Sequence, residues 1–551
     1  MSASDKKKLR KEQVAAQMTE RQRQQQKEDK KLKIYTVTFV TALILIVCLA
    51  VGLMIGQSVT TSGNAERKTI AATVGDHEIN TVEMAYYYSD AINQMYNSMY
   101  GSGDVYAEYY MEAMGLDPKT PLTEQKNPET GDTWANYFLD AALESAQSDY
   151  AVYDLAKADS SFTLPEESKQ TITTAVGNLQ AYATMNGYNS ADKYLQAIYG
   201  YGADVASYEK YVERSETARA YYNYYYETRS FDDKQIRELE EKNGAEQYNA
   251  YTYAYAYLTY NDFLEGGKEG EDGTKTYTEE ENNAARAKAK EAAEKLGKAK
   301  TLEELKELIK TIEVPETSQL AVNEETKELH TNINAPVSEW LSNAKRKAGD
   351  IAVIENTAKV SEDSDETVVN GYYVVFFQSK TDNSELMDDV RHLLVAYEGG
   401  TTDETTGETT YTDEEKKKAA DEAKALLEEY QKNATVDNFI AMVKEHTDDE
   451  ASKETGGLYE NIHYNSEYME TFRDWAIDPN RKESDTGIVE TSYGCHIMYY
   501  VGNSKMTYRD YLISEELRAE TMEAWYESAK EATPIVKKDL SKLSMDITLS
   551  N

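Results

Sequence analysis

The stretch TYTEEE at residues 276–281 recurs almost unchanged as TYTDEE at residues 410–415. Both copies lead directly into a segment rich in alanine, lysine and glutamate, a composition that favours a helix. Similarity at a fixed spacing is typical of a chain in which one structural unit is built more than once. The repeat therefore predicts two copies of one fold in the second half of the chain.

The repeat extends well beyond this motif. The segments TLEEL and TVDNF align at a spacing of 134 residues, and two tryptophans, each followed by an Arg-Lys pair, align at a spacing of 135. Each copy closes with a glycine and an aromatic run typical of a strand, GYYVVFFQSK or GCHIMYYVG. The matching positions are Thr301 and Thr435, Trp340 and Trp475, and Gly371 and Gly494.

Each copy reads as a strand, an acidic loop, a helix, a short helix, a strand, a hairpin and a final strand. Short antiparallel strands with helices packed on a face form an α+β unit. We expect the first unit at residues 246–380 and the second at residues 388–503. The predicted fold class is therefore α+β with several domains, which a length of 551 residues also favours.

The rest of the chain after residue 56 is predicted to be mainly helical. Within residues 57–245, a short strand with a turn at residues 70–79 precedes segments with apolar and aromatic residues at helical spacing. The tail at residues 504–551 begins with a similar helix, which needs a surface on which to bury its apolar face. We expect this C-terminal helix to pack on the domain at residues 57–245 and to complete it.

An uncharged run of 23 residues, Ile34–Gly56, predicts a transmembrane helix, for which about 20 apolar residues suffice. The preceding residues 1–33 carry 11 Lys and Arg against 5 Asp and Glu. The positive-inside rule then places this basic tail in the cytoplasm and everything after Gly56 outside. We therefore expect a single-pass protein of the cell membrane with its bulk outside the cytoplasm.

Two other interpretations of this apolar run are possible. A cleaved signal peptide usually has a shorter apolar core and a shorter basic region. A lipoprotein anchor needs a small residue before the modified cysteine, whereas Val47 precedes Cys48 and more apolar residues follow. A membrane-spanning helix therefore explains the run better than either alternative.

The composition excludes several classes of function. The net charge of −40, from 99 Asp and Glu against 59 Lys and Arg, argues against nucleic acid as a partner, because binding it requires a basic face. Cys48 and Cys495 lie in distant parts of the chain, so neither a disulfide framework nor a structural zinc site is available. No HExxH, CxxC or glycine-rich phosphate loop occurs. We expect neither a metal nor an organic cofactor.

The second copy of the repeat carries a series of short motifs. It opens with RHLLV at residues 391–395, continues with DNF at 437–439 and with HTDD and GGL within 446–458, and closes with GIVET and YGCHI within 487–497. In their order and spacing, these motifs resemble the parvulin domain over about 115 residues. The order of helical region, parvulin units and closing helix is similar to the PrsA- and SurA-like foldases.

This resemblance implies a parvulin-type peptidyl-prolyl cis/trans isomerase and foldase at the outer face of a bacterial cell membrane. Its partners would be unfolded or partly folded secreted polypeptides with X-Pro bonds. Rotation about such a bond meets a barrier of about 18–20 kcal/mol that amide resonance sets. Because no bond to another molecule is made or broken, the site needs only an apolar slot for the proline ring and polar groups that favour the twisted amide.

The resemblance also implies which residues form the site. His392 and His496 would face each other from two central strands and hold a hydrogen-bond network, which Thr491 supports. Asp449 stands where parvulins carry Cys or Asp, close to the twisting carbonyl, and its charge would disfavour the conjugated form. The candidate slot for the proline ring consists of Leu458, Met469 and Phe472.

The chain departs from the family pattern at two places near this slot. The family's G-G-x-L-G stretch is shortened to Gly-Gly-Leu-Tyr, and Tyr468 holds the spacing at which a methionine usually precedes the pocket phenylalanine. Purely structural roles are the alternative: a strand histidine often only completes the hydrogen bonding of the fold, and Phe472 could be an ordinary core residue.

The first copy lacks the polar groups of the second. In the repeat, Tyr257 corresponds to His392 and Tyr373 to His496, while the aspartate position falls near Pro315. We therefore predict a catalytically silent parvulin-like domain that acts as a spacer or a peptide-binding surface.

Two other functions compete with catalysis. The chain could be a holdase that binds unfolded secreted chains without turnover, because its tyrosine-rich helical region offers adaptable amphipathic surface. It could also be a structural protein of the cell envelope in which the repeats serve as spacers. A proline-isomerisation assay discriminates between catalysis and both alternatives.

Overall fold

The computed structural model describes residues 63–100, 110–111, 113–269, 274–359, 364, 366–403 and 409–549. These residues divide into two compact units, one that ends at Ser230 and resumes at Arg518, and one that spans Phe231–Leu517. The basic tail and the transmembrane helix predicted for residues 1–33 and 34–56 lie outside the described residues. Within the part that is described, no helix is long and apolar enough to cross a bilayer.

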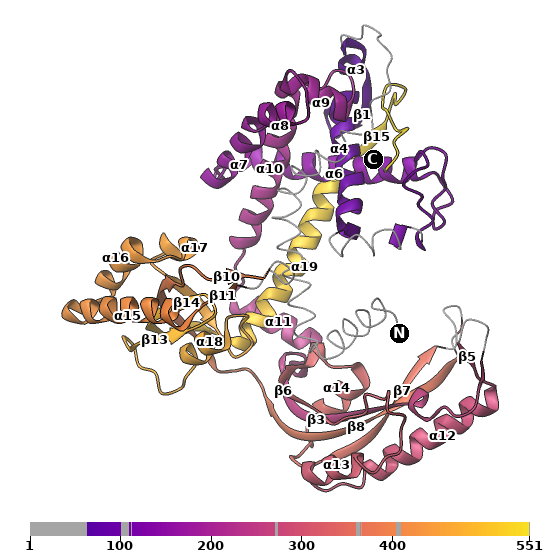
Figure 1. Ribbon diagram of the computed structural model, residues 1–551, viewed down its shortest axis with the longest axis vertical. Coiled ribbons are helices and arrows are strands. Elements are labelled where there is room, and N and C mark those ends of the chain that lie inside the picture. Colours follow the sequence, from indigo (N-terminus) through magenta and orange to yellow (C-terminus); the bar gives the residue numbers. More distant parts are fainter. Residues whose placement is uncertain are drawn as a thin grey trace. The chain divides into compact units, whose positions relative to one another are not determined.

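The first unit is mainly helical, with a small sheet at one end (Figure 1). The sheet has the strand order β15-β1-β2, so a strand from near the C-terminus pairs with the first strand of the unit. Its elements are α3 (Asn64–Lys68), β1 (Ile70–Val74), β2 (His77–Asn80), α4 (Thr81–Tyr100), α6 (Trp134–Ala158), α7 (Glu166–Gly177), α8 (Leu179–Met185), α9 (Ala191–Tyr199), α10 (Val205–Glu227), the second part of α19 (Tyr508–Ala532) and β15 (Ile535–Lys537).

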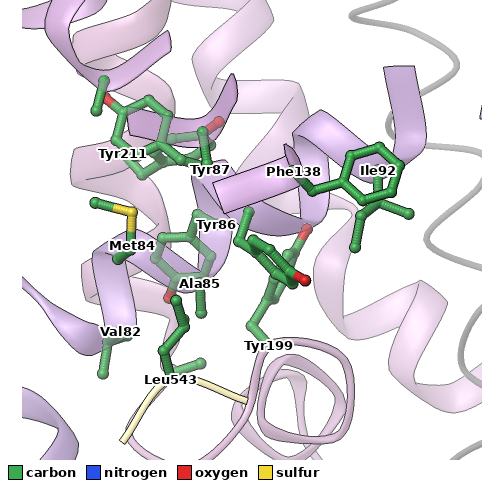
Figure 2. Packing of buried hydrophobic residues seen from close by; sticks show 14 of the residues in the cluster. Val82, Met84, Ala85, Tyr86, Tyr87, Ile92, Phe138, Tyr199, Tyr211 and Leu543 are labelled. Carbon is green, nitrogen blue, oxygen red and sulfur yellow. The ribbon is translucent and has the colours of Figure 1, made fainter. Parts of the chain in front are cut away.

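Tyrosines form much of the core of this unit. The adjacent residues Tyr86, Tyr87 and Tyr88 on α4 are at most 1% exposed, and Figure 2 shows the first two among other buried residues. Tyr86 and Tyr87 each pack against Tyr211 of α10, with ring centroids 5.2 and 5.0 Å apart. Leu543, from the end of the chain, is buried in the same core. The C-terminal tail is therefore an integral part of this unit.

The boundary between the units differs from the expected one. Helix α11 (Asp233–Asn243) belongs to the second unit, whereas the sequence pattern extends the helical domain to residue 245. The apolar side of α11 presents Ile236 and Leu239, which are buried together with Ile513 from the first part of α19. Helical spacing predicts that such a face must be covered, but it does not say by which domain.

The second unit contains two domains with the same topology, which confirms the expected α+β multidomain fold. Their four-stranded antiparallel sheets have the orders β6-β3-β8-β7 and β12-β9-β14-β13. The first domain consists of β3 (Ala250–Thr259), β4 (Lys268–Glu269), β5 (Lys275–Thr276), α12 (Glu279–Leu296), α13 (Leu302–Ile309), β6 (Asn323–Leu329), α14 (Ala335–Ser342), β7 (Ile351–Lys359) and β8 (Thr367–Thr381). The second consists of β9 (Leu386–Ala396), β10 (Thr401–Thr402), β11 (Thr409–Thr410), α15 (Asp413–Tyr430), α16 (Val436–His446), α17 (Glu450–Lys453), β12 (Leu458–Ile462), α18 (Glu470–Ala476), β13 (Thr486–Glu490) and β14 (Gly494–Thr507).

The repeated TYTEEE and TYTDEE motifs start α12 and α15. Thr278 and Glu281 form a capping box in which each side chain accepts a hydrogen bond from the other residue's backbone, and Thr412 and Glu415 do the same. Each glutamate also accepts a backbone N–H from the preceding loop, which closes that loop against the helix. The repeat was therefore recognisable because the same local hydrogen bonds are built twice.

Helices cover both faces of each sheet. In the second domain, α15 and α16 pack on one face through Ala423, Phe439 and Val443, and α18 packs on the other through Phe472 and Ala476. The apolar residues of β9 and β14 alternate between these two layers. The face under α18 also carries two buried histidines, His392 and His496.

Candidate active site

His392 and His496 lie on the two central strands of the second domain's sheet. The ladder pairs His496 of β14 with Leu394 of β9, so the two histidines are diagonal neighbours on one face. Their Nδ1 atoms are 3.0 Å apart, and their rings stack at a centroid distance of 5.1 Å. Both side chains are buried, so the Nε2 atom of each ring also needs a hydrogen-bond partner.

Asp449 and Thr491 supply those partners at the two ends of the histidine pair. Asp449 Oδ2 lies 3.0 Å from His392 Nε2, and Thr491 Oγ1 lies 2.8 Å from His496 Nε2. The four side chains thus form one continuous hydrogen-bonded chain, Asp449–His392–His496–Thr491. The structure brings together all four residues that the sequence singled out for polar roles.

The protonation states along this chain follow from the environment of its members. The hydrogen bond from His392 holds the pKa of Asp449 well below its usual range, so the carboxylate is ionised and can only accept. His392 Nε2 must therefore donate to it. Burial, together with the neighbouring His392, lowers the pKa of His496 to about 4, so this ring is neutral at neutral pH. A neutral His496 can donate at one nitrogen and accept at the other.

The segment that carries Asp449 is fixed to the edge of β9. The Asp448 N–H donates to the carbonyl of Leu394 at 2.9 Å, and the Leu394 N–H donates to Thr447 Oγ1 at 3.1 Å. On the other side of α17, the His392 N–H donates to the carbonyl of Gly457 at 2.9 Å. These contacts set the distance between the carboxylate and the imidazole before any substrate binds.

Gly457 is required for this close approach. Its φ is +74°, and a Cβ atom there would lie 2.1 Å from the backbone oxygen of His392. Any other residue would be strained in this conformation and would also push the chain away from β9. The glycine of the GGL motif therefore lets α17 and β12 reach the histidine strand.

Aromatic rings surround the histidine pair on its apolar side. Phe472 of α18 is 4% exposed, and its ring centroid lies 5.4 Å from both histidine rings. Tyr459 of β12 stands edge-on to His392 at 4.8 Å, and Tyr468 packs against Phe472 at 5.5 Å. This arrangement places a cluster of aromatic rings directly beside the ionised Asp449.

The other two slot residues predicted from the sequence lie differently. Leu458 lies opposite Arg391 in the ladder, and Met469 is 42% exposed at the start of α18. Neither belongs to the apolar cluster around Phe472, whereas Tyr459 and Tyr468 pack against it. The sequence indicated Tyr468 only as a departure from the methionine spacing, and Tyr459 only as a departure from the glycine pattern.

Ser452 is a further neighbour of the carboxylate that the sequence motifs did not indicate. Its hydroxyl donates to Asp449 Oδ2 and lies 3.4 Å from His392 Nε2. Ser452 stands three residues after Asp449, one turn along α17, which is the only local signal that could have found it. In the described part of the chain, no group of His, Cys, Asp and Glu could hold a metal ion.

The first domain carries tyrosines in place of the histidine pair, but the predicted correspondence needs a correction. The strand partner of His496 lies two residues after His392, whereas the partner of Tyr373 is Tyr257 itself. Tyr255, two residues earlier, therefore occupies the position of His392. Its ring lies 6.1 Å from that of Tyr373. The spacing of the TYTEEE and TYTDEE motifs misses this shift because the first copy has extra residues between the strand and the Gly-Gly pair of the following loop.

Comparison with known proteins agrees with the geometry of the second domain. Residues 392–502 match the family described as Rotamase: PPIC-type PPIASE domain. No curated protein matches the chain. The match to the family covers nearly all of the second domain and includes both histidines, the aspartate and the aromatic rings.

Solved structures of peptidylprolyl isomerase PrsA show a weak similarity. PrsA from Bacillus anthracis is 18% identical with a TM-score of 0.17, and the match covers 27% of this chain and 59% of that one. PrsA from Bacillus cereus is 19% identical with a TM-score of 0.17, and the match covers 31% of this chain and 59% of that one. This chain thus spans less than two thirds of either PrsA, and TM-scores this low add nothing to the family match. Residues 392–502 nevertheless form a parvulin domain, a member of the PPIC-type peptidyl-prolyl isomerase family.

Proposed function

We propose that the parvulin domain isomerises X-Pro bonds of exported polypeptides at the site formed by Asp449, His392, His496 and Thr491. The proline ring would pack on Phe472 and its neighbouring tyrosines. The negative charge of Asp449 disfavours the conjugated amide, in which the carbonyl oxygen carries the most negative charge, and so favours the twisted state. The observation that carries this proposal is the unbroken hydrogen-bonded chain from Asp449 to Thr491 beside Phe472.

The two histidines act through position and not as acid and base. Twisting an amide transfers no proton to another molecule, so the site gains from a fixed electrostatic field that needs no rearrangement during the reaction. A neutral His496 and a His392 that donates from Nε2 hold the carboxylate in place. Thr491 closes the chain and fixes the orientation of the His496 ring.

The test is a proline-isomerisation assay on the full chain in detergent, with Asp449→Asn as the main variant. Asparagine keeps the shape but removes the charge, and we expect kcat/KM to fall on the order of 100-fold, as for loss of one preorganised polar group. The matched control is Tyr373→Phe in the first domain, at the position that corresponds to His496. Wild-type turnover by Asp449→Asn, or a folded wild-type chain without turnover, would refute the proposal.

The same proposal places the domain outside the cytoplasm of a bacterial cell, held to the cell membrane by residues 34–56. The support is the uncharged run of 23 residues and the excess of Lys and Arg before it. Unfolded secreted chains with X-Pro bonds would then meet the site as they leave the membrane. Protease added to cells stripped of their wall should degrade the parvulin domain, and complete protection would contradict this placement.

Holdase activity is the second candidate, and the first domain favours it. This domain keeps the strand order of the parvulin domain but has Tyr255 and Tyr373 where the histidine pair stands. Exposed tyrosines of the helical unit, such as Tyr137 and Tyr201, add adaptable surface. Suppression of client aggregation that survives the double variant His392→Gln/His496→Gln would support a holdase.

A further inference from the structure

Tyr459 reaches into the site from an edge strand. It is the second residue of β12 and pairs with Val390 of β9, so its side chain lies on the same face of the sheet as His392. Its Oη donates to Asp449 Oδ2 at 3.1 Å, and its ring stands edge-on to His392 with a centroid distance of 4.8 Å. One side chain thus contacts both the charged group and the imidazole.

The two oxygens of the Asp449 carboxylate have unequal surroundings. Oδ2 accepts from three side chains, namely His392 Nε2, Ser452 Oγ and Tyr459 Oη. Among the described residues, Oδ1 accepts one hydrogen bond, from the backbone N–H of Ala451 at 3.3 Å. Three donors from three different elements converge on Oδ2 and hold this oxygen in place, so losing one of them weakens that hold.

The ring of Tyr459 is itself held in place. It packs against Tyr468 at 5.3 Å and against Phe472 at 5.9 Å. Burial and the neighbouring Asp449 raise the pKa of Tyr459 well above its usual value, so the hydroxyl remains a donor across the physiological range. A rigid aromatic donor of this kind loses little entropy when it holds the carboxylate.

We propose that Tyr459 is a positioning residue of the isomerase site, whose hydroxyl fixes the Asp449 carboxylate beside His392. This inference rests on the proposed role of Asp449. Tyr459 stands where the family's G-G-x-L-G pattern has its last glycine. The parvulin domain of this protein therefore adds a donor that a glycine could not supply.

The decisive variant is Tyr459→Phe in the full chain, assayed for isomerisation of an X-Pro peptide. Phenylalanine keeps the ring against His392, Tyr468 and Phe472 and removes only the hydroxyl. We expect kcat to fall about tenfold, the order for loss of one hydrogen bond to a charged group, with KM unchanged. Tyr499→Phe is the matched control, because its hydroxyl contacts Ser484 and its ring packs on the opposite face of the sheet.

A double-mutant cycle separates positioning from simple packing. If Tyr459 acts through the carboxylate, adding Tyr459→Phe to Asp449→Asn should change kcat less than twofold. Wild-type kcat in Tyr459→Phe, or a full tenfold loss in the Asp449→Asn background, would overturn the inference. Failure of the proposed function looks different, since Asp449→Asn alone would then leave the rate unchanged.

Discussion

Acid sensitivity of the parvulin domain offers a quantitative test of the buried histidine pair. His496 is 7% exposed, and in the described part of the chain its two ring nitrogens face His392 and Thr491. Protonating it would place a positive charge in a buried site next to a second imidazole. For this reason its pKa is lowered from 6.5 to about 4 in the folded protein. We propose His496→Gln as the perturbation, because glutamine is polar but does not titrate.

The sign and size of the effect follow from proton binding in the two states. Below pH 6.5 the unfolded chain takes up a proton at His496, whereas the folded domain does so only below about pH 4. Stability from this group is therefore complete above pH 6.5 and is lost as the pH falls to about 4. Since one pKa unit is worth about 1.4 kcal/mol, the loss amounts to about 3 kcal/mol. His496→Gln should remove this dependence.

Hydrogen exchange measures this dependence within the full chain. Amides of β9 and β14, the two central strands, report opening of the parvulin domain separately from the other domains. From pH 6.5 to pH 4.5 we expect the opening free energy of the wild type to fall by about 2–3 kcal/mol more than that of His496→Gln. Other groups of the domain, such as Asp388 and Asp389 at the far end of β9, titrate in both proteins and cancel in the difference.

The matched control is His446→Gln at the C-terminal end of α16. His446 belongs to the same domain but is exposed, so its replacement should keep the wild-type dependence on pH. Equal pH slopes for the wild type and His496→Gln would refute the buried neutral histidine. The hydrogen-bonded chain would then need a charged His496 and a different assignment of its protons.

Two further predictions concern how the unit is held together. Gly457→Ala should destabilise the parvulin domain by about 2–3 kcal/mol, measured by hydrogen exchange, because the new Cβ would meet the His392 carbonyl. Gly131 has the same φ of +74° but open space around it, so Gly131→Ala should destabilise its own unit by only about 1 kcal/mol. Arg509→Ala should destabilise the second unit by about 3 kcal/mol in urea, since its guanidinium bonds Glu240, an amide oxygen and two backbone carbonyls. An equal loss of stability in the two glycine variants would show that the close approach at Gly457 is not needed. An unchanged urea midpoint in Arg509→Ala would show the same for the contacts of Arg509.

Local patterns in the sequence predicted much of the second unit. The TYTEEE and TYTDEE motifs indicated two helix starts because a capping box involves only neighbouring residues. The motifs around His392, Asp449 and His496 indicated the polar part of the site, since each lies in a segment with a recognisable pattern. Phe472 was predicted by the same resemblance to the parvulin family, as part of the slot for the proline ring.

The aromatic wall and the domain boundary could not be predicted in this way. Tyr459 and Tyr468 were visible only as departures from a family pattern, and nothing local says that a tyrosine on an edge strand meets Asp449. The predicted correspondence of Tyr257 with His392, where the structure has Tyr255, could not be corrected from local patterns either. A shift of two residues keeps the alternation of faces, so hydrophobic pattern alone cannot detect it.

The sequence by itself determined the repeated α+β units, the helical character of the first unit and the identity of the polar residues at the site. The repeated units and the helices depend on interactions within a turn or a strand, and the polar residues were identified by the resemblance of short motifs to the parvulin family. Only the tertiary structure decided that α11 joins the second unit, that Tyr459 and Tyr468 line the site, and that four polar side chains form one chain. Such contacts join residues 104 positions apart in the histidine pair and 269 positions apart between α19 and α11, and their geometry depends on strand pairing and helix packing that no single segment encodes.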